Sequence, residues 1–118
     1  MDDFTKITPY EIRNLIRKEK FNKQTSGISL GYAQANLVIL PKRDALEFQI
    51  FAQRNPKPCP ILDITDPGDP EPKYAAPGAD IRTDLPRYRI YRDGTLVDEV
   101  QNINNYWEED FVGFLLGC

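Results

Sequence analysis

The sequence predicts an α+β or mixed α/β fold that combines short helices, a β-hairpin and a long, ordered, proline-rich loop. Three observations predict it. Short apolar runs with helical or alternating spacing lie on both sides of the chain's centre. Eight of the ten prolines lie between Gln53 and Pro86, and Asp93-Gly94 separates two alternating segments. We therefore expect helix, loop, strand, helix, long loop, hairpin and helix in that order, with the strand order left open.

The first predicted element is a helix that begins at Thr8-Pro9-Tyr10-Glu11. Thr8 is a good N-cap, proline suits the first helical position, and glutamate follows three residues after the cap. Ile12, Leu15 and Ile16 then recur at helical spacing. Residues Asn22 to Gly31 are polar and contain glycine, which predicts a loop.

A short strand and a second helix are predicted next. Leu37 to Leu40 is rich in β-branched residues and is closed by Pro41, which is typical of a buried strand. From Lys42 to Gln53 the apolar residues cover most of a helical wheel, so we expect a helix buried on more than one side. Arg54 would then lie at its C-terminal end, where the helix dipole favours a cation.

The stretch from Gln53 to Pro86 cannot be a helix interior or a central strand, because proline fixes φ and lacks the backbone N–H. Pro56 to Pro60 alternates proline with other residues, which predicts an extended segment presenting Lys57 and Cys59. Ile61 to Thr65 is a predicted short strand, and Asp66 to Asp69 a predicted turn. Long ordered loops are more often functional than merely connective.

A hairpin and a final helix complete the prediction. Arg87 to Tyr91 and Leu96 to Val100 alternate on either side of Asp93-Gly94, which predicts two paired strands. After Asn104-Asn105, a set of apolar residues at helical spacing predicts a helix: Trp107, Phe111, Phe114 and Leu115. Its apolar face has no obvious neighbour, so we expect an exposed patch and an incomplete chain.

Composition limits the function classes. The chain has 118 residues, 41% hydrophobic and 28% charged, with a formal net charge of −3, and this favours a soluble, cytoplasmic protein over a nucleic-acid or membrane binder. It contains no histidine, so histidine-based catalysis and metal binding are excluded within it. Cys59 and Cys118 lack metal-ligand spacing, and neither a metal site nor a cofactor motif is predicted.

Three irregular strings carry a resemblance. They are Gln53-Arg54-Asn55-Pro56-Lys57-Pro58-Cys59-Pro60, Pro67-Gly68-Asp69-Pro70-Glu71-Pro72 and Gly78-Ala79-Asp80-Ile81-Arg82-Thr83-Asp84-Leu85-Pro86. With Gly31 to Pro41 and Phe114 to Cys118, they resemble the hydro-lyase family that includes the mitochondrial D-glutamate cyclases. The resemblance implies a lyase that closes D-glutamate to 5-oxo-D-proline. It also implies that residues 1–118 are a single domain or the N-terminal part of a larger domain, truncated and inactive alone.

Candidate site residues follow from chemical type. Such a reaction needs a group that holds a carboxylate, which arginine does with its planar fork, and groups that move protons. For substrate binding we expect Arg54 or Arg82 as the clamp, with Asn55 and Thr83 as neutral donors. For catalysis we expect Lys57, Asp80 and Asp84.

Each choice has a structural alternative. Arg82 and Asp84 could pair with each other or with Arg87 to lock the loop, and Cys59 more often serves as a small buried apolar residue. Two other functions also stay open. One is a non-catalytic module that binds a small amino acid or carboxylic acid, and the other is an interaction fragment that forms a homo-oligomer.

Overall fold

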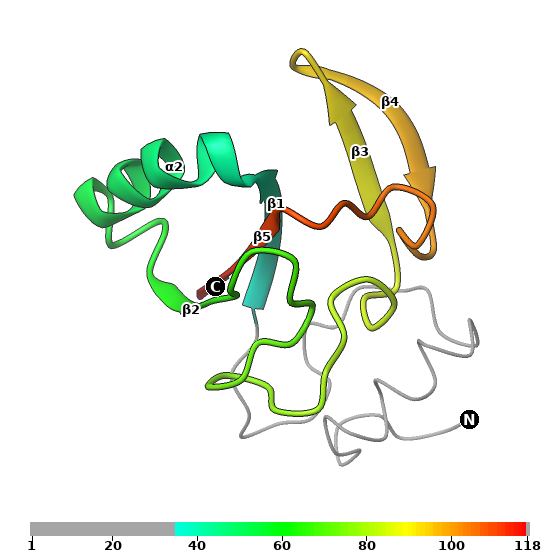
Figure 1. Ribbon diagram of the computed structural model, residues 1–118. Helices are drawn as coiled ribbons and strands as arrows, with labels where there is room; N and C mark the ends of the chain where they lie inside the picture. The colour runs from blue at the N-terminus through cyan, green and yellow to red at the C-terminus, as the bar shows by residue number, and fades with distance from the viewer. Residues whose placement is uncertain (1–34, 118) are drawn as a thin grey trace, which may run out of the picture. The chain divides into compact units, whose positions relative to one another are not determined.

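The computed structural model describes residues 35–117 and contains one helix and five strands in that part of the chain. These residues divide into two compact units, one formed by residues 35–81 and 107–117 and the other by residues 82–106. Figure 1 shows the elements of both. A mixed α/β composition with antiparallel sheets confirms the predicted fold class. The predicted helix at Thr8 and the loop from Asn22 to Gly31 lie outside the described residues.

The first unit is built on a three-stranded antiparallel sheet with the order β1-β5-β2. Strand β1 spans Ala35–Pro41, β5 spans Phe111–Gly117 and β2 spans Ile61–Ile64. Strand β5 lies in the middle, with Val38 of β1 opposite Phe114. The strands predicted around Leu37 and Ile61 are both confirmed, but their common neighbour comes from the other end of the chain.

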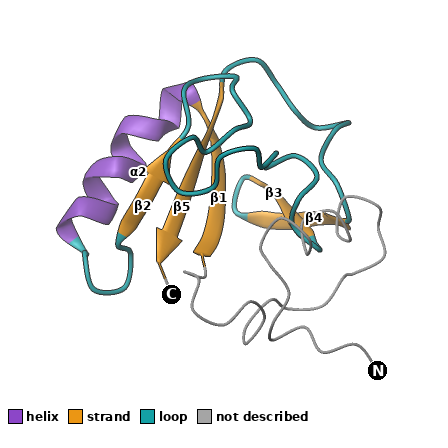
Figure 2. Ribbon diagram, turned by 90° about the horizontal axis from the view of Figure 1, so that it is seen from below, coloured by secondary structure: helices purple, strands orange, loops and turns teal. Residues whose placement is uncertain are grey.

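Helix α2, Lys42–Arg54, begins directly after β1 and covers one face of this sheet (Figure 2). Pro41 ends the strand and precedes the helix, a position at which its missing N–H costs nothing. The rings of Phe48 and Phe114 meet edge to face with centroids 4.9 Å apart. Val112, Phe114 and Leu116 alternate along β5 and form the buried cluster under the helix.

The helix is not buried on more than one side, contrary to the sequence prediction. Ala52 is its one fully buried residue, while Leu46, Ile50 and Phe51 are exposed. Only the face that carries Ala45, Phe48 and Ala52 packs on the sheet. The apolar residues elsewhere on α2 are left uncovered in this structure.

The proline-rich loop supplies residues to the opposite face of the sheet. Thr65 pairs with Gly113 of β5 twice, because its N–H donates to the Gly113 carbonyl at 2.9 Å and its hydroxyl accepts from the Gly113 N–H at 2.8 Å. The Ile81 side chain lies so close to Gly113 that a Cβ there would be 2.4 Å from Ile81 Cδ1. Strand β5 is therefore sandwiched between α2 and this loop.

This sandwich explains why the prediction of a helix from Trp107 to Leu115 is wrong. Residues 111–117 form the central strand β5, buried on both faces, and such strands have nearly continuous apolar sequences. Phe114 is fully buried, so the expected exposed patch over Phe111, Phe114 and Leu115 is also wrong. Trp107 lies before the strand and packs edge-on against Phe111, with ring centroids 5.6 Å apart.

The segment from Pro56 to Pro60 is a turn, not the extended segment that its prolines predict. The N–H of Cys59 donates to the carbonyl of Asn55 at 2.9 Å, which closes a single five-residue turn. The local preference for polyproline II geometry is overridden because the chain must reverse between α2 and β2.

The second unit contains the predicted hairpin, formed by β3, Tyr88–Arg92, and β4, Thr95–Val100. Asp93 and Gly94 have φ values of 50° and 77°, as a type I′ turn requires. The predicted turn at Asp66 is also confirmed, since the Asp69 N–H donates to the Asp66 carbonyl at 3.0 Å. Gly68 has a φ of 80° there, which suits glycine after Pro67 in a type II turn.

Candidate functional site

The C-terminal end of α2 positions the first group of predicted site residues. Asn55 ends the helix, since its backbone N–H donates to the Ala52 carbonyl at 3.1 Å and its side-chain amide donates to the Phe51 carbonyl at 2.8 Å. Both bonds satisfy carbonyls that a helix end leaves unpaired. Arg54 lies in the last helical turn, where its charge also favours the helix dipole.

Arg54 and Lys57 are two exposed cations on either side of this cap. Neither forms an ion pair with a carboxylate in residues 35–117, whereas Lys73 is paired with Asp69 and Arg87 with Glu99. A cation that is already paired with a carboxylate attracts a further anion less strongly, because the carboxylate offsets its positive charge. Arg54 and Lys57 have no such carboxylate beside them in the described part of the chain. They are therefore the predicted site residues best able to bind a carboxylate from solution.

A shallow pocket of about 290 Å³ lies between α2 and β2, and neither cation is among its lining residues. Gln49, Ala52 and Gln53 line it from the helix. The connecting turn and β2 contribute the remaining lining: Pro56, Cys59, Pro60, Ile61 and Ile64. Arg54 and Lys57 directly follow two of the lining residues, Gln53 and Pro56, in the chain. The pocket therefore combines an apolar floor with two amides and the half-buried thiol of Cys59.

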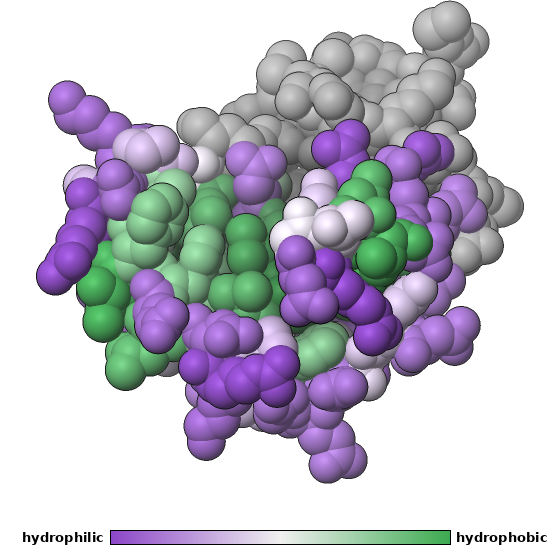
Figure 3. Space-filling model, turned by 90° about the horizontal axis from the view of Figure 1, so that it is seen from above, coloured by the Kyte–Doolittle hydropathy of each residue, from purple (hydrophilic) through white to green (hydrophobic). Residues whose placement is uncertain are grey.

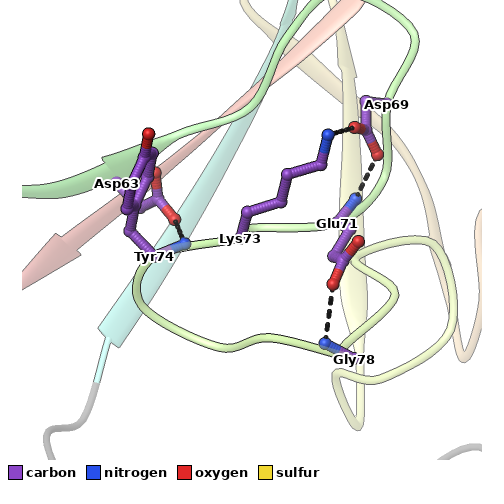
Figure 4. A network of polar contacts seen from close by, with 6 residues as sticks. All are labelled: Asp63, Asp69, Glu71, Lys73, Tyr74 and Gly78. Atoms are coloured by element: carbon purple, nitrogen blue, oxygen red, sulfur yellow. Dashed lines mark hydrogen bonds and ion pairs between the residues drawn. The ribbon is translucent and has the colours of Figure 1, made fainter.

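The loop that carries Asp80 is held by carboxylates of its own (Figure 4). Buried Asp63 accepts hydrogen bonds from the N–H groups of Ile64 at 2.8 Å and of Tyr74 and Ala75, both at 3.0 Å. Glu71 accepts from the Gly78 N–H at 2.8 Å. The residues between Asp63 and Gly78 are thus fixed by contacts within the loop and with β2.

Asp69 and Lys73 form the charged pair of the same loop, 3.1 Å apart. Two hydrogen bonds hold the pKa of Asp69 below its ordinary value. The larger effect comes from the Glu71 N–H and the smaller one from the Lys73 ammonium group. Asp69 in turn raises the pKa of Lys73. Lys73 therefore stays charged, and its charge is engaged in the ion pair with Asp69 within the loop.

Asp80 lies at the end of this loop and is partly buried. The N–H of the next residue, Ile81, donates to the Pro70 carbonyl at 2.9 Å, which fixes the backbone beside Asp80. Asp80 itself has an interaction partner in the structure. The predicted residues Arg54, Asn55, Lys57 and Asp80 thus belong to the unit built on the three-stranded sheet.

Arg82, Thr83 and Asp84 belong to the other unit, in the turns that precede β3. The Thr83 hydroxyl donates to buried Asp84 at 2.9 Å, and the Arg82 carbonyl accepts from the Ile103 N–H at 2.9 Å. Arg82 and Asp84 both have interaction partners. These three residues have side chains that could bind a substrate, and the two hydrogen bonds show that they also stabilise the turns before β3.

Sequence reasoning missed Asp63, Gln49 and Gln53. Asp63 interrupts an apolar strand, Ile61 to Ile64, and a charged residue in such a position signals a buried, fully bonded carboxylate. Gln49 and Gln53 are four residues apart and so share one side of α2. Among the described residues no cluster of three or more histidine, cysteine, aspartate or glutamate side chains could hold a metal ion. No helix in the same part of the chain is long and apolar enough to cross a membrane.

Comparison with known proteins shows which proteins the chain is similar to. The protein named "Putative hydro-lyase YcsI" from Bacillus subtilis (strain 168) is 60% identical over 112 residues, which are 95% of this chain and 44% of that protein. A hydro-lyase by name from Thermoanaerobacter sp. (strain X514) is 59% identical over 116 residues, 98% of this chain and 44% of its own.

A third such protein, from Psychrobacter arcticus (strain DSM 17307 / VKM B-2377 / 273-4), is 57% identical over all 118 residues and is covered to 45% of its length. No family model matches the chain. The chain is therefore similar to proteins named as hydro-lyases, and it spans less than half the length of these relatives.

Proposed function

We propose that this chain binds a small amino acid or carboxylic acid and contributes to a hydro-lyase reaction, the closure of D-glutamate to 5-oxo-D-proline. The observation that carries the proposal is the pair of exposed cations, Arg54 and Lys57, each of which directly follows in the chain a residue that lines the pocket between α2 and β2. The similarity to proteins named as hydro-lyases supports the reaction class.

The reaction sets the tasks that the site must perform. The α-amine nitrogen forms a bond to the γ-carboxyl carbon, and one C–O bond of that carboxyl group breaks. The ammonium group gives up two protons and the departing oxygen takes up two, so water leaves and no oxidant or reductant is needed. The protein must hold the α-carboxylate and move these two protons.

Arg54 suits the first task, because its fork binds both carboxylate oxygens and it is not engaged by a described carboxylate. Arg82 is the second candidate, and Asn55 and Thr83 are the neutral residues that directly follow these two arginines in the sequence. The Thr83 hydroxyl proton points to Asp84 here, so Thr83 would offer a ligand its oxygen lone pairs. The candidates for proton transfer are Lys57, Asp80 and Asp84.

A binding experiment tests the proposal without needing turnover. D-glutamate is titrated into the ¹⁵N-labelled chain, and amide shifts are followed for wild type and for Arg54→Lys. We expect binding to weaken about tenfold, because lysine keeps the charge but loses the fork, while the melting temperature stays unchanged. Arg43→Lys is the control, since Arg43 is exposed on the same helix and lies beside Asp44.

The result also separates the clamp candidates. Arg82→Lys should weaken binding in place of Arg54→Lys if Arg82 holds the carboxylate, and a large fall in melting temperature would instead assign Arg82 to the fold. Unchanged affinity in both variants contradicts the proposal. Binding without any 5-oxoproline formation, even when the rest of a relative is supplied, would favour the non-catalytic module.

A further inference from the structure

Strand β1 forms one edge of the three-stranded sheet, and part of its backbone points away from the sheet. Gly113 of β5 shows which part, because its N–H and C=O both bond to Thr65, on the side away from β1. Ile39 lies opposite Gly113, so the N–H and C=O of Ile39 also point away from β5. Because backbone direction alternates along a strand, the same holds for Ala35 and Leu37. No hydrogen bond to these outward groups is described among residues 35–117.

The edge of β1 lacks the features that usually protect an exposed strand, which are charged side chains, bulges and covering groups. Strand β1 contains no charged residue, and its register with β5 is continuous. At the opposite edge of the sheet, β2 has a bulge, and its Ile64 N–H donates to the carboxylate of Asp63. The hairpin strands β3 and β4 also have a bulge and carry charged residues. Of the described strands, β1 is therefore the one best able to accept a further strand.

This backbone edge says more about a partner than the exposed apolar side chains do. In the space-filling view, hydrophobic surface is bordered by hydrophilic side chains (Figure 3), and such a mixed surface is ordinary for a soluble protein. A row of unpaired N–H and C=O groups is more specific, because an extended strand offers the matching row. The chemistry of the edge thus requires an extended strand as its partner.

We propose that β1 is a dimer interface, at which two copies of this chain join their sheets edge to edge through antiparallel β1 strands. The outward residues are spaced evenly about Leu37, so a two-fold axis there places Leu37 opposite Leu37 of the second copy and Ala35 opposite Ile39. Each of these pairs exchanges two hydrogen bonds, which satisfies every outward N–H group from Ala35 to Ile39 in both copies. The next outward position is Pro41, which has no N–H to leave unpaired.

The charges and the opposite edge of the sheet favour a second copy as the partner. Because β1 is uncharged, two identical strands meet without the repulsion that like charges on opposite strands would cause. Because the β2 edge is protected, each sheet has one edge open, and pairing stops at two copies instead of continuing into a fibre. The two sheets would form one continuous sheet with the two copies of α2 on the same face.

The test measures the mass of the full 118-residue chain by sedimentation equilibrium over a wide range of concentrations. Ala35→Pro removes one outward N–H from each copy, and proline is tolerated at the first residue of an edge strand. Ala35→Ser is its matched control, because serine keeps the N–H at the same exposed position.

A second pair of variants tests the proposed register. Leu37→Lys places two lysines opposite each other at the two-fold axis, whereas Asn36→Lys places each lysine opposite Val38 of the second copy. The Asn36→Lys variant is therefore the control for adding a positive charge to β1. Circular dichroism and melting curves establish that each variant folds.

We expect a monomer–dimer equilibrium whose Kd rises about tenfold or more in Ala35→Pro and Leu37→Lys, and less than about threefold in the two controls. In the wild-type chain, hydrogen exchange at the N–H groups of Leu37 and Ile39 should slow as concentration rises. The N–H of Val38 points toward β5 and should be protected at every concentration.

Three results would overturn the proposal. They are a monomer at every concentration, a dimer that Ala35→Pro and Leu37→Lys leave as tight as their controls do, and exchange at Leu37 and Ile39 that does not change with concentration. The last result bears on the wild-type chain alone, so the proposal can be refuted even if a variant fails to fold. It does not depend on D-glutamate binding, so the two proposals can fail separately.

Discussion

Asp63 organises more backbone than any other side chain in the proline-rich loop for which hydrogen bonds are described. Its two oxygens accept from three N–H groups, one on β2 and two in the segment around Tyr74, eleven and twelve residues away. A carboxylate can satisfy several donors at once, which is why a charged residue is stable at 7% exposure here. Asp63 therefore fixes the start of the loop that ends with Asp80.

We expect Asp63→Asn to destabilise the protein by about 2 kcal/mol, because one oxygen becomes an amide that faces N–H donors and leaves them unsatisfied. Asp66→Asn should change stability by less than about 0.5 kcal/mol, since the Asp66 side chain is exposed. Urea unfolding of both variants measures the difference. Equal midpoints for the two would show that the Asp63 carboxylate does not hold the loop.

Gly113 sets how closely the loop can approach β5. A Cβ at this position would lie 2.4 Å from Ile81 Cδ1, a distance that forces movement of the loop or the strand. We expect Gly113→Ala to cost about 1–3 kcal/mol by overpacking.

Ile81→Val removes the very atom that the new Cβ meets. The double variant Gly113→Ala/Ile81→Val should therefore be more stable than the sum of the two single losses predicts, which a double-mutant cycle by urea unfolding measures. Strictly additive losses would mean that the contact between Gly113 and Ile81 does not set the spacing.

At the scale of elements, the sequence correctly predicted those elements whose structure depends on residues close together in the chain. Asp93-Gly94 requires positive φ at both positions, and the hairpin forms there. The helix after Pro41 and the turn at Pro67-Gly68 follow from similarly local chemistry. Strand β5 could not be predicted in the same way, because its apolar run fits a buried strand or a helix and the choice depends on β1 and β2, which lie far away in sequence.

For the candidate site, too, residue types could be predicted from the sequence, whereas features that depend on the fold could not. Residue chemistry indicated Arg54 and Lys57, and the structure leaves both cations exposed. The pocket between α2 and β2 could not be predicted, because it depends on a turn at Asn55 to Cys59 that the prolines disfavour locally. The functional role of every predicted site residue, Arg54 and Lys57 included, stays a prediction.

The hairpin unit contains a hydrogen bond that should be visible in its titration. The Tyr106 hydroxyl donates to Asp98 at 2.6 Å, and this bond is the main cause of the lowered pKa of Asp98. The hydrogen bond from the Glu99 N–H to Asp98 lowers this pKa further. Because the folded-state pKa is lowered, the stabilisation is present above the pKa of the unfolded state and is lost as pH falls through the folded value.

We therefore expect Tyr106→Phe to raise the pKa of Asp98 towards its ordinary value, which NMR titration of the carboxyl carbon measures. The stability difference from wild type should shrink as the pH is lowered through the titration of Asp98. Tyr91→Phe serves as the control, since Tyr91 is exposed on β3 and should leave Asp98 unchanged. A pKa that is the same in all three proteins contradicts this reading of the bond.

At the scale of the whole molecule, the candidate site on the unit built on the sheet is open to solvent. Arg54 and Lys57 are exposed, and the pocket between α2 and β2 is shallow. Amide cyclisation needs groups held in a preorganised, water-excluding site, and a displacement near 1 Å can cost about 10²-fold in rate. A solvent-exposed surface of this kind can bind an anion weakly, but it is poorly suited to catalysing a reaction of that anion.

We accordingly expect that the 118 residues alone do not convert D-glutamate to 5-oxo-D-proline at a measurable rate, and that turnover appears when the unmatched part of a relative is co-expressed with them. The relatives named as hydro-lyases have more than half of their length beyond the matched residues, which is ample to cover the pocket and to supply further acid–base groups. Product is followed by NMR. Arg54→Lys should slow the co-expressed pair, whereas Arg43→Lys should not. Rapid turnover by the isolated, monomeric chain would refute the prediction and place all the required acid–base chemistry on residues of this chain.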